Sequence, residues 1–387
     1  MIETQGKAQQ PVVRHQPVRV VEARGDVKFG KNNEFQVELR RRVDEFFQRT
    51  GRRRRDVPQM YFKTAILLTS FAAIYVLLVF VVRTWWQALP VAILFGLITA
   101  AIGFNIQHDG EHQAYSEHAW VNKLMALTLD LIGGSSYRWH YKHNVLHHTY
   151  VNITDEDPDI TLGMLARLTP HQKRYWFHRL QHFYIWPLYG LFVIKWQVFD
   201  DFRDLIRGRI GEHRIPRPRG WDLVGFIVGK LVFFTLALVI PLLLHRPWVV
   251  FLYYGIVGAV LGSVLSVVFQ LAHAVEDAEF PMPMEGTSNM ENAWAIHQVE
   301  TTVDFARRSR VAAWLLGGLN FQIEHHLMPR ICHVNFPALS PIVEETCREF
   351  GVKYNEHRSF RAGLASHFRW LREMGRKSSE TATAQPG

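Results

Sequence analysis

The chain has 387 residues, of which 48% are apolar and 20% are charged, below the roughly 25% charged residues of a typical soluble protein. Its 44 Lys and Arg against 35 Asp and Glu give a net charge of +9, which is compatible with a nucleic acid or an anionic membrane surface as partner. Long apolar runs favour the membrane over nucleic acid, and two cysteines, Cys332 and Cys347, exclude a disulfide framework.

The first 60 residues are polar and include the run Arg52–Arg55, which indicates either a solvated surface or contact with lipid headgroups. This segment has no apolar core of the kind found in a signal peptide. We therefore interpret residues 1–60 as a polar cytoplasmic N-terminal segment, and we expect the first membrane helix to direct insertion.

Four apolar runs have about the length needed to cross roughly 30 Å of hydrocarbon. The predicted spans are residues 64–82, 88–106, 223–244 and 249–271. Lys230 is the sole Lys, Arg, Asp or Glu inside them, and no polar track accompanies it in the sequence. The second span leads directly into His108 and the fourth into His273.

The remaining elements are shorter. Residues 183–199 are apolar but contain Pro187 and Lys195, which predicts an interfacial or half-inserted segment. Residues 337–350 have apolar side chains at helical spacing, and residues 360–376 are expected to form a basic amphipathic helix on the membrane surface. Residues 378–387 are expected to be disordered. We divide the chain into residues 1–60, a main domain at 61–355, and 356–387.

Charge predicts the topology. Lys and Arg are concentrated before the first span and between the second and third, whereas the loops at 83–87 and 245–247 carry one Arg each. The positive-inside rule then places both termini and the long middle segment in the cytoplasm. The expected fold is an all-α integral membrane bundle of four helices with a cytoplasmic helical cap.

Histidines gather in three short clusters that all fall on this cytoplasmic side. They are His108-Asp-Gly-Glu-His112, His143-Asn-Val-Leu-His147-His148 and Gln322-Ile-Glu-His325-His326. On a helix, residues four apart share one face, with Cβ atoms about 6 Å apart, so the first two clusters each present two imidazoles together. His273 adds an eighth imidazole at the same level.

Eight imidazoles are too many for one ion with four to six ligands, so two metals fit better. Imidazole suits iron, zinc, copper and nickel. Structural zinc more often recruits cysteine, and Glu111 is the fourth residue of its cluster, whereas the glutamate of the His-Glu-x-x-His pattern of a hydrolytic zinc site is the second. Redox-active iron is the leading interpretation, and zinc is the second.

Acidic side chains lie beside the clusters. Asp157 and Asp159 belong either to a polar loop or to a set of carboxylates that accept the outer N–H of a ligating imidazole, and Glu324 lies inside the third cluster and can do the same. His140, His297 and His333 are expected to lie outside the ligand set.

The three clusters, in this order and spacing, resemble the histidine boxes of the membrane fatty acid desaturases. The flanking stretches Asp155-Glu-Asp-Pro-Asp159 and His326-Leu-Met-Pro-Arg-Ile-Cys-His333 agree with that resemblance. Gln322, where other branches have histidine, is similar to the front-end and linoleoyl-CoA (delta-6) desaturase-like branch.

The resemblance implies that seven box histidines and His273 bind two iron ions, with Gln322 as a further candidate. The residues concerned are His108, His112, His143, His147, His148, His273, His325, His326 and Gln322. The implied reaction uses O₂ to convert two neighbouring methylenes of a long acyl chain into a cis double bond. The chain lacks the His-Pro-Gly-Gly motif of a fused cytochrome b5 domain, so a separate ferredoxin or cytochrome b5 is the expected electron donor.

Two alternatives remain open from the ligands alone. Related histidine-box proteins hydroxylate lipids, which adds one oxygen instead of removing two hydrogens. A metal transporter or sensor would instead need ionisable groups lining a path through the spans, and the sequence shows only Lys230 there.

Overall fold

The computed structural model describes residues 27–376. The predicted disordered tail at 378–387 and the first 26 residues of the polar N-terminal segment lie outside the described residues. The described chain is mainly helical, with three short strand pairs, as the predicted all-α membrane bundle requires.

Four helical stretches are long and apolar enough to cross a membrane. They cover Pro58–Val81, Trp85–Glu111, Trp221–Leu244 and Pro247–His273. Each predicted span overlaps one of these stretches, which begins a few residues earlier than predicted. The longer helices include Lys63, Asp109, Glu111 and Asp222, so Lys230 is the sole charged residue only within the shorter predicted bounds.

The spans are α-helices interrupted or extended by π-helical turns. Their segments are α2 (Pro58–Val76), η1 (Leu77–Val81), α3 (Trp85–Ile102), η2 (Gly103–Gln107), α4 (His108–Glu111), α11 (Trp221–Phe234), η7 (Thr235–Val239), α12 (Ile240–Leu244) and α13 (Pro247–His273).

The other helical segments lie between and around the spans. They are α1 (Glu34–Thr50), α5 (Ala119–Ala126), α6 (Thr128–Leu131), α7 (Ser136–Trp139), η3 (His140–His147), α8 (His148–Tyr150), η4 (Gly163–Leu165), η5 (Trp176–Leu180), α9 (Gln181–Lys195), η6 (Trp196–Asp200), α10 (Asp201–Arg207), α14 (Trp294–Glu300), α15 (Arg310–Leu315), α16 (Gln322–Leu327), η8 (His333–Asn335), α17 (Phe336–Glu349) and α18 (Phe360–Gly375). The strands pair as β1 (Lys28–Gly30) with β4 (Asn289–Ala293), β2 (Arg209–Ile210) with β3 (His213–Arg214), and β5 (Asp304–Phe305) with β6 (Glu356–His357).

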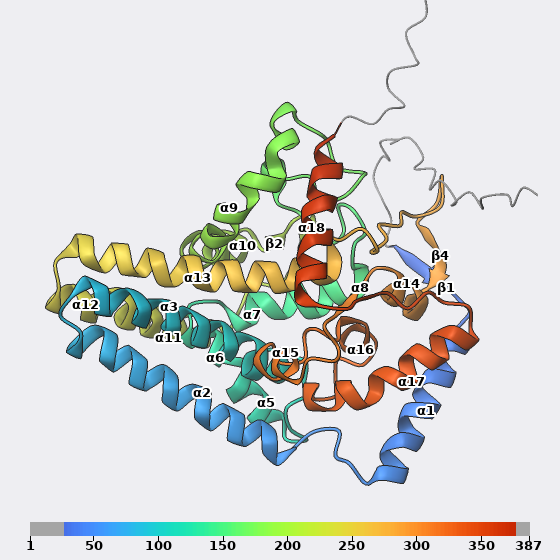
Figure 1. Ribbon diagram of the computed structural model, residues 1–387, viewed down its shortest axis with the longest axis horizontal. Coiled ribbons are helices and arrows are strands. Elements are labelled where there is room, and N and C mark those ends of the chain that lie inside the picture. The colour runs from blue at the N-terminus through green and yellow to red at the C-terminus, as the bar shows by residue number, and fades with distance from the viewer. Residues whose placement is uncertain (1–26, 377–387) are drawn as a thin grey trace, which may run out of the picture.

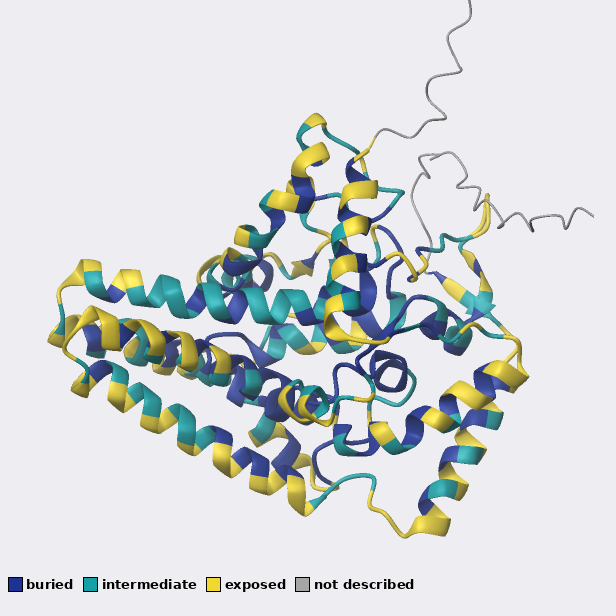
Figure 2. Ribbon diagram, viewed as in Figure 1, coloured by how far each residue is buried: buried dark blue, intermediate teal, exposed yellow. Residues whose placement is uncertain are grey.

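The spans form one bundle, and the remaining helices cover one end of it as a cap (Figure 1). The spans differ in the share of residues that is buried within their most apolar stretch. This share is 50% for the second span (α3 through α4) and 39% for the fourth (α13), but only 11% for the first (α2 through η1) and for the third (α11 through α12). The second and fourth spans are therefore the centre of the bundle. Large apolar side chains such as Leu231 and Leu243 remain exposed, and Figure 2 marks many residues of α2 as exposed. A hydrocarbon environment covers such surfaces.

α9 lies along α13, and glycines allow the two helices to approach closely. A Cβ added to Gly262 would lie 2.6 Å from the carbonyl oxygen of Tyr189, closer than any side chain can be placed. Small residues at a crossing let membrane helices pack backbone to backbone. The apolar segment predicted at 183–199 is therefore a helix packed on the fourth span.

The cap has its own apolar core. Phe35, Leu39 and Val43 of α1 pack with Leu339 and Val343 of α17. α17 corresponds to the amphipathic helix predicted at 337–350. α1 belongs to the same core as the segment that leads into α16, so part of the polar N-terminal segment is built into the cap.

α18 is the helix predicted at 360–376, but its position corrects one expectation. Its face with His367, Trp370 and Leu371 is buried against α9 and α13, so this face does not lie on the membrane surface. The periodicity predicted the apolar face correctly but could not show which surface would cover it.

The buried charge in the third span also differs from expectation. Lys230 Nζ donates to the backbone oxygens of Gly133 (2.7 Å) and Gln197 (3.1 Å) and to the Asp201 carboxylate (2.7 Å). Polar partners do accompany it, from segments distant in sequence. They form a closed hydrogen-bonded network, whereas a transport pathway requires ionisable groups along a continuous path.

Candidate metal centre

The first cluster lies where the second span ends. The π-helical turn η2 leads into α4, and His108 and His112 leave the same side of this helix end, with ring centroids 4.7 Å apart. π-helical turns inside α-helices occur frequently at functional sites. The predicted sharing of one helix face by His108 and His112 is seen here.

The second cluster lies on a π-helix instead of the regular α-helix on which the spacing argument was based. His143 and His147 belong to η3 and stack with centroids 5.0 Å apart at 24°, whereas His148 begins α8 and its ring stands at 83° to that of His147. The ring of His148 therefore stands across the stacked pair of His143 and His147.

The third cluster is the short helix α16 in the centre of the cap, where Gln322 through His326 are all buried. The rings of His325 and His326 stand at 84° to each other. Each ring therefore points toward a different set of imidazoles. His273, the last residue of α13, lies with its ring centroid 4.7 Å from that of His147 and 5.0 Å from that of His326.

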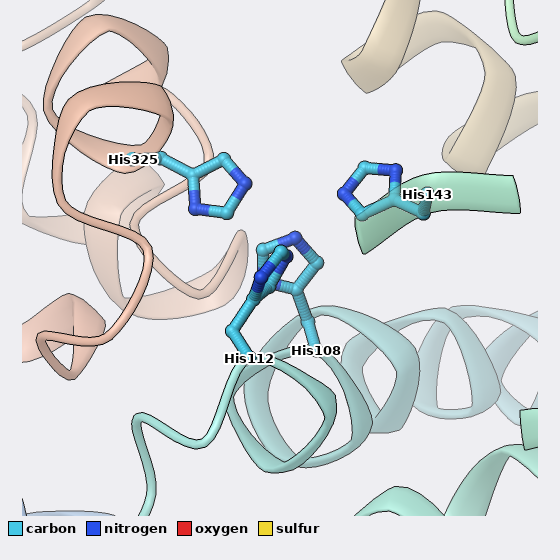
Figure 3. A group of neighbouring side chains, drawn as sticks. All are labelled: His108, His112, His143 and His325. Atoms are coloured by element: carbon cyan, nitrogen blue, oxygen red, sulfur yellow. The ribbon is translucent and has the colours of Figure 1, made fainter. Parts of the chain in front are cut away.

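The rings make two main groups. His108, His112, His143 and His325 have ligand nitrogens within 4.8 Å of one another, and so do His147, His273 and His326. His148 lies within the same distance of His325 and His326 and so stands between the groups. Figure 3 shows the first group, with His143 and His325 facing each other across His108 and His112.

Most of these rings have a nitrogen that is buried but not hydrogen-bonded. Within the described chain, the unpartnered atoms are Nε2 of His112, His143, His147, His325 and His326, and both ring nitrogens of His148 and His273. Leaving a buried polar atom without a partner is costly, and here the atoms concerned converge. A metal ion in each group would satisfy them, so the residues fit two metals.

Burial, followed by neighbouring imidazoles, lowers the pKa of His148 and His326 well below the usual value for histidine. Burial and then His108 do the same to the pKa of His325. These rings are therefore neutral near pH 7, the form in which imidazole binds metals.

Outer acceptors hold several rings by Nδ1, which leaves Nε2 directed inward. Asp157 Oδ2 lies 2.9 Å from Nδ1 of His147, and Asp159 Oδ2 lies 3.4 Å from Nδ1 of His143. The sequence placed both carboxylates near the second cluster. It missed Gln298, whose Oε1 lies 2.9 Å from Nδ1 of His326, because no motif surrounds this residue.

Glu324 occupies a different place from the one expected. Its carboxyl accepts a hydrogen bond from the hydroxyl of Tyr354 (2.8 Å), and no bond to an imidazole is seen for it in the described chain. Burial, and then the charge of Asp304, raises the pKa of Glu324 well above its usual value. Its contribution is to fix α16 within the cap.

Two other histidines, His297 and His333, support the site from outside, whereas a third, His140, does not. His297 Nε2 donates to the backbone oxygen of Val151 (2.9 Å). His333 donates from Nδ1 to Asp109 (3.0 Å) while its Nε2 lies 3.1 Å from Lys63 Nζ. His140 lies exposed beyond the second cluster. None of the three belongs to a histidine group found in the described chain.

A cavity of about 820 Å³ reaches the first group. Its histidine side is formed by His108, His143 and His325, with Gln322 beside them. Lys142, Asp159, Arg203 and His213 line its polar part, and Phe104, Leu129, Leu261, Leu265 and Phe269 line its apolar part. A long apolar molecule with a polar end matches this lining.

Comparison with known proteins agrees with the site. The family model for fatty acid desaturases matches residues 83–358. The sn-1 linoleoyl-lipid 6-desaturases of Arthrospira platensis and of a Synechocystis species are 41% and 35% identical, over 90% and 91% of this chain and 94% and 98% of their own lengths. An acyl-lipid (8-3)-desaturase of Physcomitrium patens is 35% identical over 92% of this chain and 76% of its own length.

These matches confirm the resemblance read from the three histidine clusters, including its front-end branch. The chain belongs to the fatty acid desaturase family and is an enzyme that introduces double bonds into acyl chains.

Proposed function

We propose that the two imidazole groups hold two iron ions and that the enzyme desaturates, with O₂, an acyl chain carried by a membrane lipid. The observation that supports this most strongly is the convergence of buried, unpartnered Nε2 atoms beside the 820 Å³ cavity. Iron is favoured because an all-imidazole site suits a redox metal and the reaction of the family is an oxidation.

One ion would be held by His108, His112, His143 and His325, and the other by His147, His273 and His326, with His148 between them. Bound iron would supply the redox chemistry that couples reduction of O₂ to two waters with loss of one hydrogen from each of two neighbouring methylenes, with the remaining two electrons coming from the separate donor and two protons from solvent. Gln322 stands beside the first group as a further candidate ligand.

The chain's own residues would hold the substrate and keep water out. The apolar part of the cavity would bind the acyl chain in one register against the first group, and Trp139, stacked on His143 at 4.2 Å, would cover the imidazoles. Positioning of this kind supplies much of a catalyst's advantage. The polar part, with Lys142 and Arg203, suits an ester-linked headgroup, so that the new double bond would lie near the carboxyl end of the chain.

We place the cap and both termini in the cytoplasm. The supporting observation is the distribution of Lys and Arg, which are scarce in the loops at 83–87 and 245–247 and abundant in the cap. A cysteine introduced at Thr84 should react with an impermeant thiol reagent added outside intact cells, and one at Gly286 should not. The reverse pattern would overturn the orientation.

A separate ferredoxin or cytochrome b5 would supply the electrons. The arginine loop, residues Arg52–Arg55, is a suitable docking site, with Arg52 and Arg53 exposed. Backbone oxygens of Arg53 and Arg54 accept hydrogen bonds from Asn335 and Cys332, at 3.0 and 2.9 Å, so this exposed basic loop is fixed to the segment that follows the third cluster. Complementary charge speeds docking of an acidic donor.

Two measurements test this docking site. Turnover should fall as the salt concentration rises, and Arg53→Glu should slow turnover with the donor protein but not with a small chemical reductant. Turnover that does not depend on salt would contradict the docking proposal.

The central experiment is expression in a host that lacks the product. Lipids are analysed by gas chromatography and mass spectrometry with position-locating derivatives, and iron is measured on the purified protein. His147→Ala should lose iron and desaturation, whereas His140→Ala, an exposed histidine in the same segment, should keep both. Products that gain one oxygen would indicate hydroxylation, and full iron content with activity in His147→Ala would overturn the ligand assignment.

A further inference from the structure

A second cavity lies deeper in the bundle, at the end of the spans away from the histidines. It has a volume of about 380 Å³ and is lined mainly by apolar side chains of α2, α3, α11 and α13, including Phe71, Phe95, Phe233 and Val257. Three residues, Ile132, Gln197 and Leu261, line both this cavity and the one that reaches the histidines. The two spaces are therefore neighbours that share one wall.

A hydrogen-bonded pair of polar side chains stands in that wall. Gln197 is 3% exposed, its Nε2 donates to the backbone oxygen of Ile132 (2.9 Å), and its Oε1 accepts from the hydroxyl of Tyr254 (3.0 Å). Tyr254 lines the second cavity. The amide thus spans from the segment after α6 to α13.

The position of this pair is fixed from several sides. Gln197 belongs to the π-helical turn η6, and its backbone oxygen accepts from Lys230 Nζ. A Cβ added to Gly133 would lie 2.8 Å from Gln197 Nε2, so the amide also fits closely against the chain. Separating the pair would leave buried polar atoms without hydrogen-bond partners, which is unfavourable. The hydrogen bonds therefore hold both side chains in place within the wall.

The wall lies at a depth that matters for a long acyl chain. Leu261 lies twelve residue steps before His273 on α13, which at 1.5 Å per residue is a rise of roughly 18 Å. A chain whose reacting carbons lie at this histidine end of the bundle would extend its methyl end over a distance on the order of this rise before meeting the wall.

We propose that the Gln197–Tyr254 pair closes the acyl cavity and sets the greatest length of chain that the enzyme accepts beyond the reacting carbons. The inference rests on the proposed function, since it takes the larger cavity as the acyl site. Opening the wall would join the two cavities and admit longer methyl ends.

The test compares acyl lipids lengthened two carbons at a time, supplied in competition to the iron-loaded enzyme. Gln197→Ala removes the bulk and both hydrogen bonds of the amide, and should raise the preference for the longer chains by about tenfold or more, the scale on which apolar pockets discriminate single methylenes. Tyr254→Phe removes only the hydroxyl and should shift the preference in the same direction by less. Tyr75→Phe is the matched control, because it removes a hydroxyl in the second cavity that bonds to Leu236 instead, and should leave the preference unchanged.

Binding provides a second measurement that does not depend on turnover. The measured quantity is the distance between Phe95, in the second cavity, and the spin label of a bound acyl lipid of each length. For the longer chains this distance should be shorter in Gln197→Ala than in the unaltered enzyme. An unchanged length preference together with unchanged label positions in Gln197→Ala would overturn the inference. An unaltered enzyme that binds these lipids but makes no desaturated product would instead count against the proposed function.

Discussion

Asp157 Oδ2 accepts a hydrogen bond from Nδ1–H of His147 at 2.9 Å, and the same oxygen accepts the backbone N–H of Asn152 at 3.0 Å. The other carboxylate oxygen accepts the backbone N–H of Asp159 at 2.8 Å. One side chain therefore orients an imidazole and closes the loop that follows the second cluster. Asn152 in turn donates to the backbone oxygen of His273 (2.9 Å), which ties this loop to the end of the fourth span.

Asp157→Asn should lower iron affinity and desaturation by about 10–100-fold, the usual cost of losing a group that orients a metal ligand. Both carboxylate oxygens of Asp157 accept hydrogen bonds from N–H donors. In Asp157→Asn the amide NH₂ replaces one of these oxygens, so two donors would face each other there. Iron content and turnover of the purified variant measure the effect. Asp222→Asn is the control, because it makes the same change at an exposed position outside the lining of both cavities. An equal loss in both variants would contradict the orienting role.

Gln298→Leu should weaken metal binding by His326. The substitution removes the acceptor of Nδ1–H and leaves that donor buried without a partner, at a cost of about 1–3 kcal/mol. We expect a lower ratio of iron to protein and a changed Mössbauer spectrum. Gln298→Glu keeps an acceptor at the same reach and should retain iron, so loss of iron in both variants alike would show that Gln298 acts through packing alone.

The sequence was sufficient to find the spans and the three clusters, because both depend on local patterns: uninterrupted apolar length, and histidines at short spacing. It could not divide the histidines between two groups. That division depends on which rings from other segments each histidine meets, as with His325 and His326, whose rings stand at 84° to each other, and only the packed cap determines this. Gln298 and Tyr254 carry no local pattern either, and their roles follow from which distant segment each one meets.

Gly317→Ala should destabilise the enzyme at the contact between the first and third clusters. Gly317 has φ +60°, and a Cβ there would lie 2.2 Å from the backbone oxygen of Phe104, in the turn before His108. The left-handed conformation costs a non-glycine residue roughly 1–2 kcal/mol, and the collision adds about 1–3 kcal/mol. Gly286→Ala is the control that separates the two effects, because Gly286 has φ +74° but open space around it. Thermal unfolding in detergent should show a clearly larger loss of stability for Gly317→Ala than for Gly286→Ala. Equal losses of stability would exclude the collision.

Lys230→Met should be strongly destabilising even though it makes the third span more apolar. The Asp201 carboxylate is fully buried and lies 2.7 Å from Lys230 Nζ. Among the described residues it would keep only Arg138, at 3.7 Å, as a cationic neighbour, and breaking a buried pair from one side costs about 3–5 kcal/mol. The second substitution, Asp201→Asn, removes the uncompensated charge. It also keeps an oxygen that can accept the indole N–H of Trp196, which donates to Asp201 at 2.6 Å. The double variant should therefore unfold at a higher temperature than Lys230→Met alone. Lys195→Met breaks a pair with Asp200 whose lysine is 49% exposed, and should cost no more than about 1 kcal/mol. If Lys230→Met unfolds at the same temperature as Lys195→Met, the network around Lys230 does not stabilise the bundle, and the position of η6 must be fixed by packing alone.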